Sequence, residues 1–230
     1  MMQTLRIQQL GMDTGQVEAL RGFYAETLGL PVIAEEAGSF TVQTGETRLK
    51  FNRAAPGEMP FYHFAFNIPE NKIEAAEDWT AGRTALLPDP ESGEMIRPWP
   101  AWDAHSIYFA DPAGNIVEFI ARHGLHNPAP GAFGPQDVLY ASEIGLPVPD
   151  VRKAAGFLQE RLGAAEYSRH EDIFCALGDA RGLFILVKTG RPWWPTQTAH
   201  AGEFPLEVSL DWEAAGALDL PGAPYRILFI

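Results

Sequence analysis

An internal repeat limits the folds open to this chain more than any other feature of the sequence. The segment that begins at Gln9 aligns without a gap, over about twenty positions, with the segment that begins at Glu143, an offset of 134 residues. The matched pairs include Val17 and Val151, Phe23 and Phe157, Leu28 and Leu162, and Gly29 and Gly163. Such self-similarity indicates that one supersecondary unit is present at least twice.

The pattern within the first copy predicts a βαβββ unit. Apolar residues of 17–28 recur at helical spacing, and Gly29 suits the C-terminal end of that helix. Residues 39–44 and 47–52 then alternate on either side of Gly45-Glu46, which indicates a hairpin. The second copy has the same hairpin signal at residues 172–177 and 182–188, around Gly178-Asp179.

Two further units complete the chain. One follows the first copy directly, and its predicted elements are a strand at 63–68, a helix at 71–80, a strand at 106–110, a turn at 111–114 and a strand at 115–122. The last unit is truncated: strands at 203–210 and 225–230 leave room for a short helical segment at 212–218.

We therefore predict an α+β fold in two tandem domains, each a pair of units. The first domain covers residues 1–122 and the second covers residues 138–230. Residues 123–137 are rich in Gly and Pro and have no period, so they are expected to form a linker.

Composition and charge exclude several classes of protein. Lys and Arg number 17 against 30 Asp and Glu, a net charge of −13, which disfavours binding to nucleic acid or to anionic membrane surfaces. The apolar runs are too short to span a bilayer, and residues 1–10 alternate like a first strand rather than a signal peptide. These features predict a cytoplasmic protein. The single cysteine, Cys175, lies in an apolar strand and is expected to be buried.

The units and their motifs resemble the vicinal oxygen chelate superfamily, which includes glyoxalases, bleomycin resistance proteins and extradiol dioxygenases. The resemblance rests on Phe-Tyr-Ala-Glu-Thr-Leu-Gly-Leu at 23–30, His-Phe-Ala-Phe-Asn-Ile at 63–68 and Tyr-Phe-Ala-Asp-Pro-Ala-Gly-Asn-Ile-Val-Glu-Phe at 108–119. It implies that paired units curl mixed sheets into cups, as in glyoxalases and dioxygenases, and that a divalent metal lies on the concave face.

The resemblance places the metal ligands at Gln9, His63 and Glu118. Strand alternation agrees with this set, because apolar residues of the opposite parity, among them Leu10, Phe64 and Val117, suit the face that packs on a helix. Gln8 is an alternative for the first place, although it has the opposite parity. An imidazole, a carboxylate and an amide oxygen suit Zn, Ni, Mn or Fe(II) with open coordination positions.

Other residues separate this chain from known members. The place of a fourth glyoxalase I ligand holds Lys50, which becomes a candidate substrate-binding residue. Tyr108 lies where extradiol dioxygenases keep a catalytic tyrosine, and packing is the alternative role. His105 is a candidate general base, with a strand-edge position as the alternative. In the second domain the ligand places hold Glu143, Pro205 and Leu228, which predicts no metal there. Glu143 is expected to be a surface carboxylate, or else to contact substrate or Lys50.

Two Pro-rich loops concentrate tryptophan. Trp99 and Trp102 follow Arg97, and Trp193 and Trp194 follow Arg191. Such loops can form rigid aromatic walls of a pocket in which either arginine holds an anionic group. The alternatives are packing against the sheets or a subunit interface.

Two functions are consistent with the sequence. The first is a metal-dependent enzyme that acts on a small oxygenated molecule as a lyase, isomerase, transferase or ring-cleaving dioxygenase. The second is a metal-free protein that sequesters a small molecule, as bleomycin resistance proteins do, in an aromatic cleft at the seam of a homodimer. The acidic balance and the tryptophans would then suit a cationic aromatic ligand.

Overall fold

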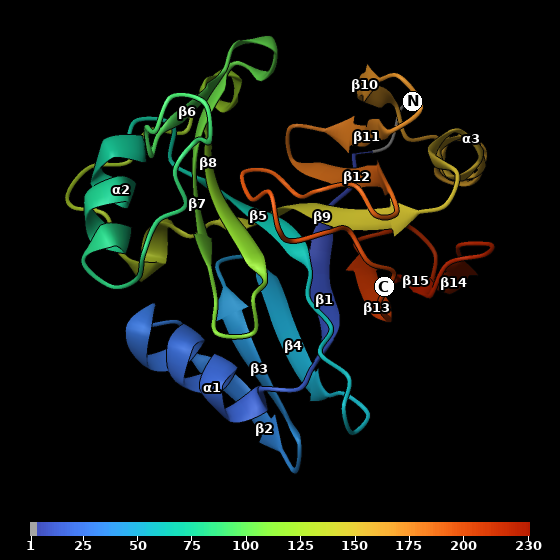
Figure 1. Cartoon of the computed structure of the whole chain (residues 1–230), viewed down its shortest axis with the longest axis horizontal. Coiled ribbons are helices and arrows are strands. Elements are labelled where there is room, and N and C mark those ends of the chain that lie inside the picture. Colours follow the sequence, from blue (N-terminus) through green and yellow to red (C-terminus); the bar gives the residue numbers. More distant parts are fainter. Residues whose placement is uncertain (1–3) are drawn as a thin grey trace.

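The strands form two mixed sheets: in Figure 1 the first combines blue and red strands, and the second runs from cyan and green strands to yellow and orange ones. The computed structural model describes residues 4–230, and within this range one sheet has seven strands and the other has eight. The order in the first sheet is β14 (Gly216–Asp219), β15 (Tyr225–Phe229), β13 (Leu206–Leu210), β1 (Ile7–Thr14), β4 (Thr47–Arg53), β3 (Ser39–Thr44) and β2 (Val32–Glu36). The order in the second is β10 (Glu166–His170), β11 (Phe174–Asp179), β12 (Gly182–Lys188), β9 (Tyr140–Val148), β5 (His63–Ile68), β8 (Ile116–Arg122), β7 (Ala104–Ala110) and β6 (Arg97–Trp99).

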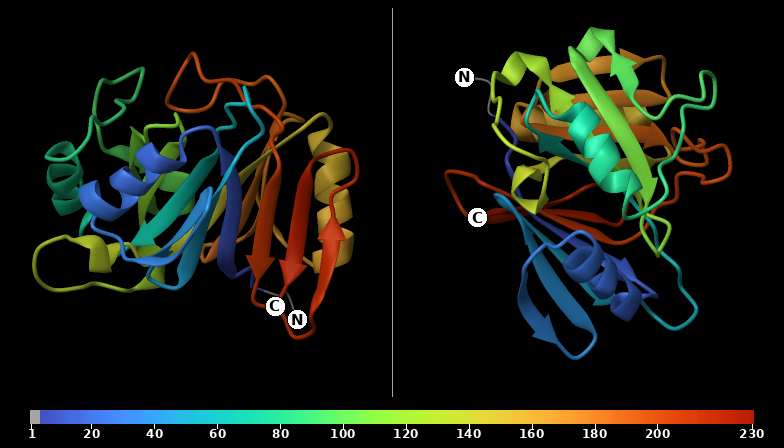
Figure 2. Two further views of the ribbon diagram at one scale, coloured as in Figure 1. Left: turned by 90° about the horizontal axis from the view of Figure 1, so that it is seen from below. Right: turned by 90° about the vertical axis from the view of Figure 1, so that its left-hand side faces the viewer.

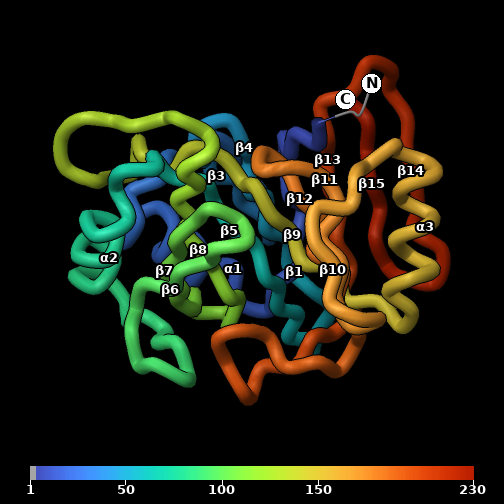
Figure 3. Tube along the Cα trace, turned by 90° about the horizontal axis from the view of Figure 1, so that it is seen from above, coloured from blue at the N-terminus to red at the C-terminus, as the bar shows by residue number. Residues whose placement is uncertain are grey.

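The helices cover the outer faces of the sheets. They are α1 (Val17–Gly22), which continues as a π-helical turn (Phe23–Thr27), α2 (Ile73–Ala81) and α3 (Val151–Leu162), with 3-10 turns at Pro100–Trp102, His123–Leu125 and Pro135–Asp137. Figure 3 shows α2 and α3 at opposite ends of the molecule. Gly29 and Gly163 follow the first and third helices with positive φ, as expected for C-terminal glycines. No helix within residues 4–230 is long and apolar enough to cross a membrane.

The α+β prediction with its βαβββ units is confirmed, but the units pair differently from the prediction. The sequence predicts that the first unit pairs with the second. Instead β1 pairs with β13 and β5 pairs with β9, so the first unit joins the fourth and the second joins the third (Figure 2). A repeat identifies the units but not which units pair, because the first strand of each unit has a free edge that could pair with the first strand of any other unit. Both sheets therefore contain strands from each side of residues 123–137.

The predicted linker is held firmly against α2. The ring of Phe133 lies 5.4 Å from that of Trp79, and Lys72 Nζ lies 2.7 Å from a carboxylate oxygen of Asp137 in a buried ion pair. Asp137 lies within the 3-10 turn that ends the linker. These contacts with α2 fix the conformation of the linker, although its sequence has no periodic pattern.

Four local predictions can be compared with the structure. The helical segment predicted at 212–218 is wrong. β14 begins within that stretch, at Gly216, and pairs with β15, and the short connection between β13 and β14 cannot complete a stable helix. The hairpin between β11 and β12 turns at Ala180-Arg181, two residues later than predicted. Cys175 is fully buried and unpaired, as expected. The predicted strand at 1–10 begins at Ile7, and residues 1–3 lie outside the described range.

Candidate metal centre

Strand alternation places three ionisable side chains on the open face of the second sheet. On β5, β8 and β9 every second residue packs into the main core beneath α2 and α3, among them Phe64, Phe119 and Ile144. The residue before each of these therefore points to the opposite face of the sheet. These three residues, called the His63 cluster below, are His63, Glu118 and Glu143.

The His63 cluster is compact and buried. One ligand atom from each residue lies within 4.8 Å of the others, and His63 Nε2 is 3.7 Å from Glu118 Oε2. The exposed fractions are 7% for His63 and 3% for each glutamate. Groups of this kind are costly to bury together unless a proton or a cation lies among them.

Hydrogen bonding fixes the tautomer of His63. Its Nδ1 lies 3.1 Å from the carbonyl oxygen of Ile116, which can only accept, so Nδ1 carries the hydrogen. Burial lowers the pKa of His63 to about 4, and the bond to Ile116 offsets only part of this effect. The ring is therefore neutral near pH 7, with its Nε2 lone pair directed into the cluster. Metal-binding histidines commonly have this arrangement, in which the other ring nitrogen donates to a backbone carbonyl.

The two carboxylates differ in their partners. Burial, followed by the charge of Glu143, raises the pKa of Glu118 well above its usual range, and hydrogen bonding with Tyr108 counteracts this in part. Burial also raises the pKa of Glu143, which forms an ion pair with Arg122. Arg122 is 1% exposed, and its Nε donates to Asn67 Oδ1 at 3.2 Å. With both glutamates ionised, one negative charge remains uncompensated, and a cation would neutralise it.

The pairing of the second and third units explains the composition of the site. Glu118 lies opposite Ala65 on β5, and the corresponding residue of the third unit, Ile185, lies opposite Gly145 on β9. Ile185 thus occupies the fourth position of a symmetric ligand set and cannot bind a metal. The remaining three side chains could hold a cation and leave coordination positions open to a ligand.

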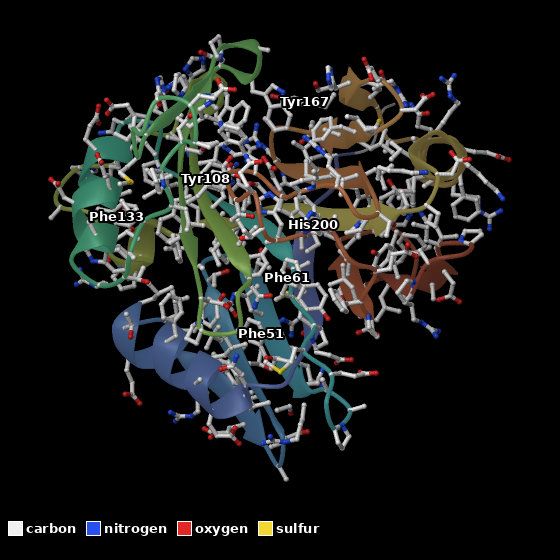
Figure 4. The ribbon with its side chains drawn as sticks, in the orientation of Figure 1. Phe51, Phe61, Tyr108, Phe133, Tyr167 and His200 are labelled. Carbon is white, nitrogen blue, oxygen red and sulfur yellow. The ribbon has the colours of Figure 1, made fainter. Side chains whose placement is uncertain are left out.

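A cavity of about 260 Å³ lies over the His63 cluster. The loop that follows β12, orange in Figure 1, runs in front of this sheet, and Figure 4 labels Tyr108 and Tyr167 on the two sides of the open face. The aromatic lining consists of Trp99, Trp102, Tyr108, Phe174, Trp193 and Trp194. Of the predicted aromatic residues, Trp99, Trp102 and Tyr108 therefore lie at this site.

Two tryptophans are held close to the sheet. The ring of Trp193 lies 5.0 Å from that of His63. This approach requires Gly145, because a Cβ there would lie 2.6 Å from Trp193 Cη2. Trp99 Nε1 donates to Ser106 Oγ at 2.7 Å on β7. These contacts give the cavity rigid aromatic walls.

Tyr108 lies directly across the β7–β8 ladder from Glu118. Burial, and then the negative charge of Glu118, raise the pKa of its hydroxyl well above the usual range, so the phenol keeps its proton. His105 is on the opposite face of β7, and its Nδ1 is 2.8 Å from His123 Nε2. It is absent from the cavity lining, because His105 and Tyr108 are three positions apart on one strand and alternation directs them to opposite faces. Its role as a general base stays a prediction of the sequence.

Other predicted residues are not brought to the His63 cluster. Gln9 and Lys50 line a separate cavity of about 220 Å³ on the open face of the first sheet. The predicted grouping of Gln9 with His63 and Glu118 is therefore wrong. Glu143 takes the place expected for Gln9, because the second unit pairs with the third. Arg97 forms an ion pair with Asp89, and its guanidinium lies over the rings of Trp99 and Trp194, where it supports the aromatic wall.

Glu143 and Arg122 are the site residues that sequence reasoning missed. The expectation that Glu143 is a surface carboxylate is wrong, since it is 3% exposed. A signal was present: Ile-Pro-Glu at 68–70 matches Val-Pro-Asp at 148–150, and this register sets Glu143 in the place of His63. Arg122 has no comparable signal, because only the fold brings it to Glu143.

Comparisons with known proteins agree with this architecture. No family model matches the chain. The "Glyoxalase 1" protein of Caenorhabditis elegans is 22% identical to this chain over 128 residues. These residues are 54% of this chain and 45% of that protein, so the match spans less than half of the curated relative. Among solved structures, a Bacillus subtilis protein assigned as a dioxygenase has a TM-score of 0.64 at 15% identity, covering 100% of this chain and 86% of that one. Glyoxalase I from Zea mays has a TM-score of 0.59 at 14% identity, covering 98% and 92%.

These matches establish the class of fold. The chain has the curled, mixed-sheet architecture of the glyoxalase and dioxygenase structures, so the fold that the sequence resemblance implies is confirmed.

Proposed function

We propose that the protein is a metal-dependent enzyme that binds one divalent cation through His63, Glu118 and Glu143 and acts on a small oxygenated molecule. The observation that carries this proposal is the convergence of three acceptor atoms within 4.8 Å of one another, in a buried cluster whose histidine is neutral. One imidazole nitrogen and two carboxylates form a donor set suited to Zn, Ni, Mn or Fe(II).

The chain's own residues would give this centre its properties. A bound cation would supply Lewis-acid chemistry, the polarisation of a carbonyl, enolate or catecholate oxygen. The ion pair with Arg122 offsets part of the rise that burial causes in the pKa of Glu143, and so favours its ionised form. The neutral phenol of Tyr108, next to Glu118, can donate a proton or hydrogen bond to a ligand in the cavity. The tryptophan loops would give this space apolar walls that limit its contact with water.

Sequestration of a small molecule without metal is the second candidate. The aromatic lining of the cavity supports it, since such walls alone can bind a flat ligand. This function does not explain why two buried carboxyl groups and a neutral histidine converge at the base of the cavity.

Turnover and ligand binding with and without metal separate the two candidates. Catechols, dicarbonyl–thiol adducts and epoxides would be incubated with the metal-loaded protein, with chelator-treated protein, and with the Glu118→Gln variant. The enzyme is expected to convert one of these classes, and both chelation and Glu118→Gln are expected to abolish conversion. Glu160→Gln, an exposed change on α3, is the matched control and should leave turnover unchanged.

An outcome in which ligands bind equally well in all these samples and no compound is converted favours sequestration. The reaction class, a cytoplasmic location and assembly as a homodimer stay predictions of the sequence.

A further inference from the structure

The cavity over the His63 cluster contains one guanidinium. Within residues 4–230, Arg191 is the single arginine or lysine of its lining, and it belongs to the loop that follows β12. Two backbone hydrogen bonds fix it there: its N–H donates to the carbonyl of Lys188 at 3.0 Å, and its own carbonyl accepts from the N–H of Ala201 at 2.8 Å. The side chain therefore starts from a defined point on the cavity wall.

Arg191 has no ionic partner in the part of the chain that the structure describes. Neither an ion pair nor a side-chain hydrogen bond of its guanidinium is found there, and its nearest aromatic contact is Phe174, with a ring centroid 5.6 Å away. Burial alone lowers its pKa, without any contribution from a neighbouring charge. Arg97 and Arg122, by contrast, each form an ion pair with a carboxylate.

An unpaired guanidinium that is partly withdrawn from water is a strong site for an anion. Its planar array of donors matches a carboxylate, and the bond strengthens where water is excluded. The other two charged side chains of the lining, Glu118 and Glu143, are at the base of the cavity and are committed to the His63 cluster and to Arg122. They are not available to neutralise Arg191.

The rest of the lining favours a flat, apolar body. Aromatic rings face the cavity from β6, from the turn after it, from β11 and from the loop after β12, and Ile185 and Val187 add aliphatic surface. Trp102 and Phe174 lie with their ring centroids 6.5 Å apart. Such walls bind planar molecules and fix their orientation with few polar groups.

We propose that this cavity selects a planar, mainly apolar molecule with one anionic group, and that Arg191 binds that group. The inference deepens the proposed function. It rests on that function only because both concern the same cavity. It assigns specificity to Arg191, whereas Arg97 serves as structural support for the tryptophans.

Three near-isosteric compounds test the charge preference: benzoate, benzamide and benzamidine carry a negative, zero and positive charge on the same ring. They would be titrated against metal-free protein, with tryptophan fluorescence as readout, so that no metal can attract the carboxylate. We expect benzoate to bind about tenfold or more tightly than benzamide, and benzamidine to bind most weakly. Arg191→Gln should remove the preference for benzoate and leave the affinity for benzamide unchanged.

Arg161→Gln is the matched control, because it removes the same charge from an exposed position on α3. It should leave all three affinities unaltered. A preference for benzoate that persists in Arg191→Gln, tightest binding of benzamidine, or no detectable binding of benzoate would each overturn the inference.

Metal content, measured on metal-replete samples of the same proteins, separates this inference from the proposed function. If the wild type binds no metal but its benzoate preference depends on Arg191, the proposed enzyme fails and the specificity stands. If metal binds but the preference is absent, the specificity fails and the metal site stands.

Discussion

Replacement of Arg122 by Met should strongly destabilise the metal-free protein. Arg122 is 1% exposed, forms an ion pair with Glu143 and has its guanidinium 5.3 Å from the ring of Trp102. Its removal leaves Glu143 buried without a countercharge, and breaking a buried pair in this way costs about 3–5 kcal/mol. The double variant Arg122→Met, Glu143→Gln removes both charges of this pair, so most of the loss should be recovered.

Urea unfolding of the metal-free wild type, both single variants and the double variant would give the coupling free energy. We expect a coupling of roughly 2–4 kcal/mol. Arg152→Met is the control, because its pair with Asp172 has side chains 76% and 61% exposed, and its loss should cost less than about 1 kcal/mol. A cost below about 1 kcal/mol for Arg122→Met, or strictly additive effects, would refute the reasoning.

Two other changes give clear expectations. The folded pKa of His63, about 4, is below its usual value of 6.5, so the unfolded chain takes up its proton first as the pH falls. The free energy of unfolding of metal-free protein should therefore lose up to about 3 kcal/mol from this group between about pH 6.5 and pH 4, a loss that His63→Gln lacks in parallel urea titrations. A pH-independent difference between the two proteins would contradict this. Gly145→Ala should displace Trp193 and cost about 1–3 kcal/mol, seen as a lower urea midpoint with altered tryptophan fluorescence. Gly156→Ala, on α3 with no atom within 4 Å of the added Cβ, should instead stabilise by roughly 0.5–1 kcal/mol, and equal effects of the two changes would count against the packing argument.

The units of the fold were readable from the sequence because they depend on local patterns. The helix that ends at Gly29 and the hairpin around Gly45 follow from apolar periodicity and turn residues within a few positions. Which unit joins which is decided by strand edges far apart in the chain. Since β1 could pair with any other first strand, the repeat alone did not favour β13.

The sequence predicts two of the three residues of the His63 cluster, and the third depends on which units pair. His63 and Glu118 belong to one unit, so the ligand places implied by the resemblance and the strand parity within that unit agreed on both residues. The third member depended on the partner unit, and the wrong pairing replaced Glu143 with Gln9 and placed Lys50 near the site. Arg122 was hidden for a different reason, because a buried arginine is recognised only when its partner is known.

Elemental analysis of metal-replete protein tests the central claim most directly, with three proteins compared side by side: the wild type, Gln9→Ala and Glu143→Gln. The ligand set His63, Glu118 and Glu143 predicts one divalent ion per chain in the wild type and in Gln9→Ala, and a large loss of bound metal in Glu143→Gln. Circular dichroism of each sample would establish that it is folded. Metal retained by folded Glu143→Gln but lost from Gln9→Ala, or no metal in the wild type, would contradict the proposed centre.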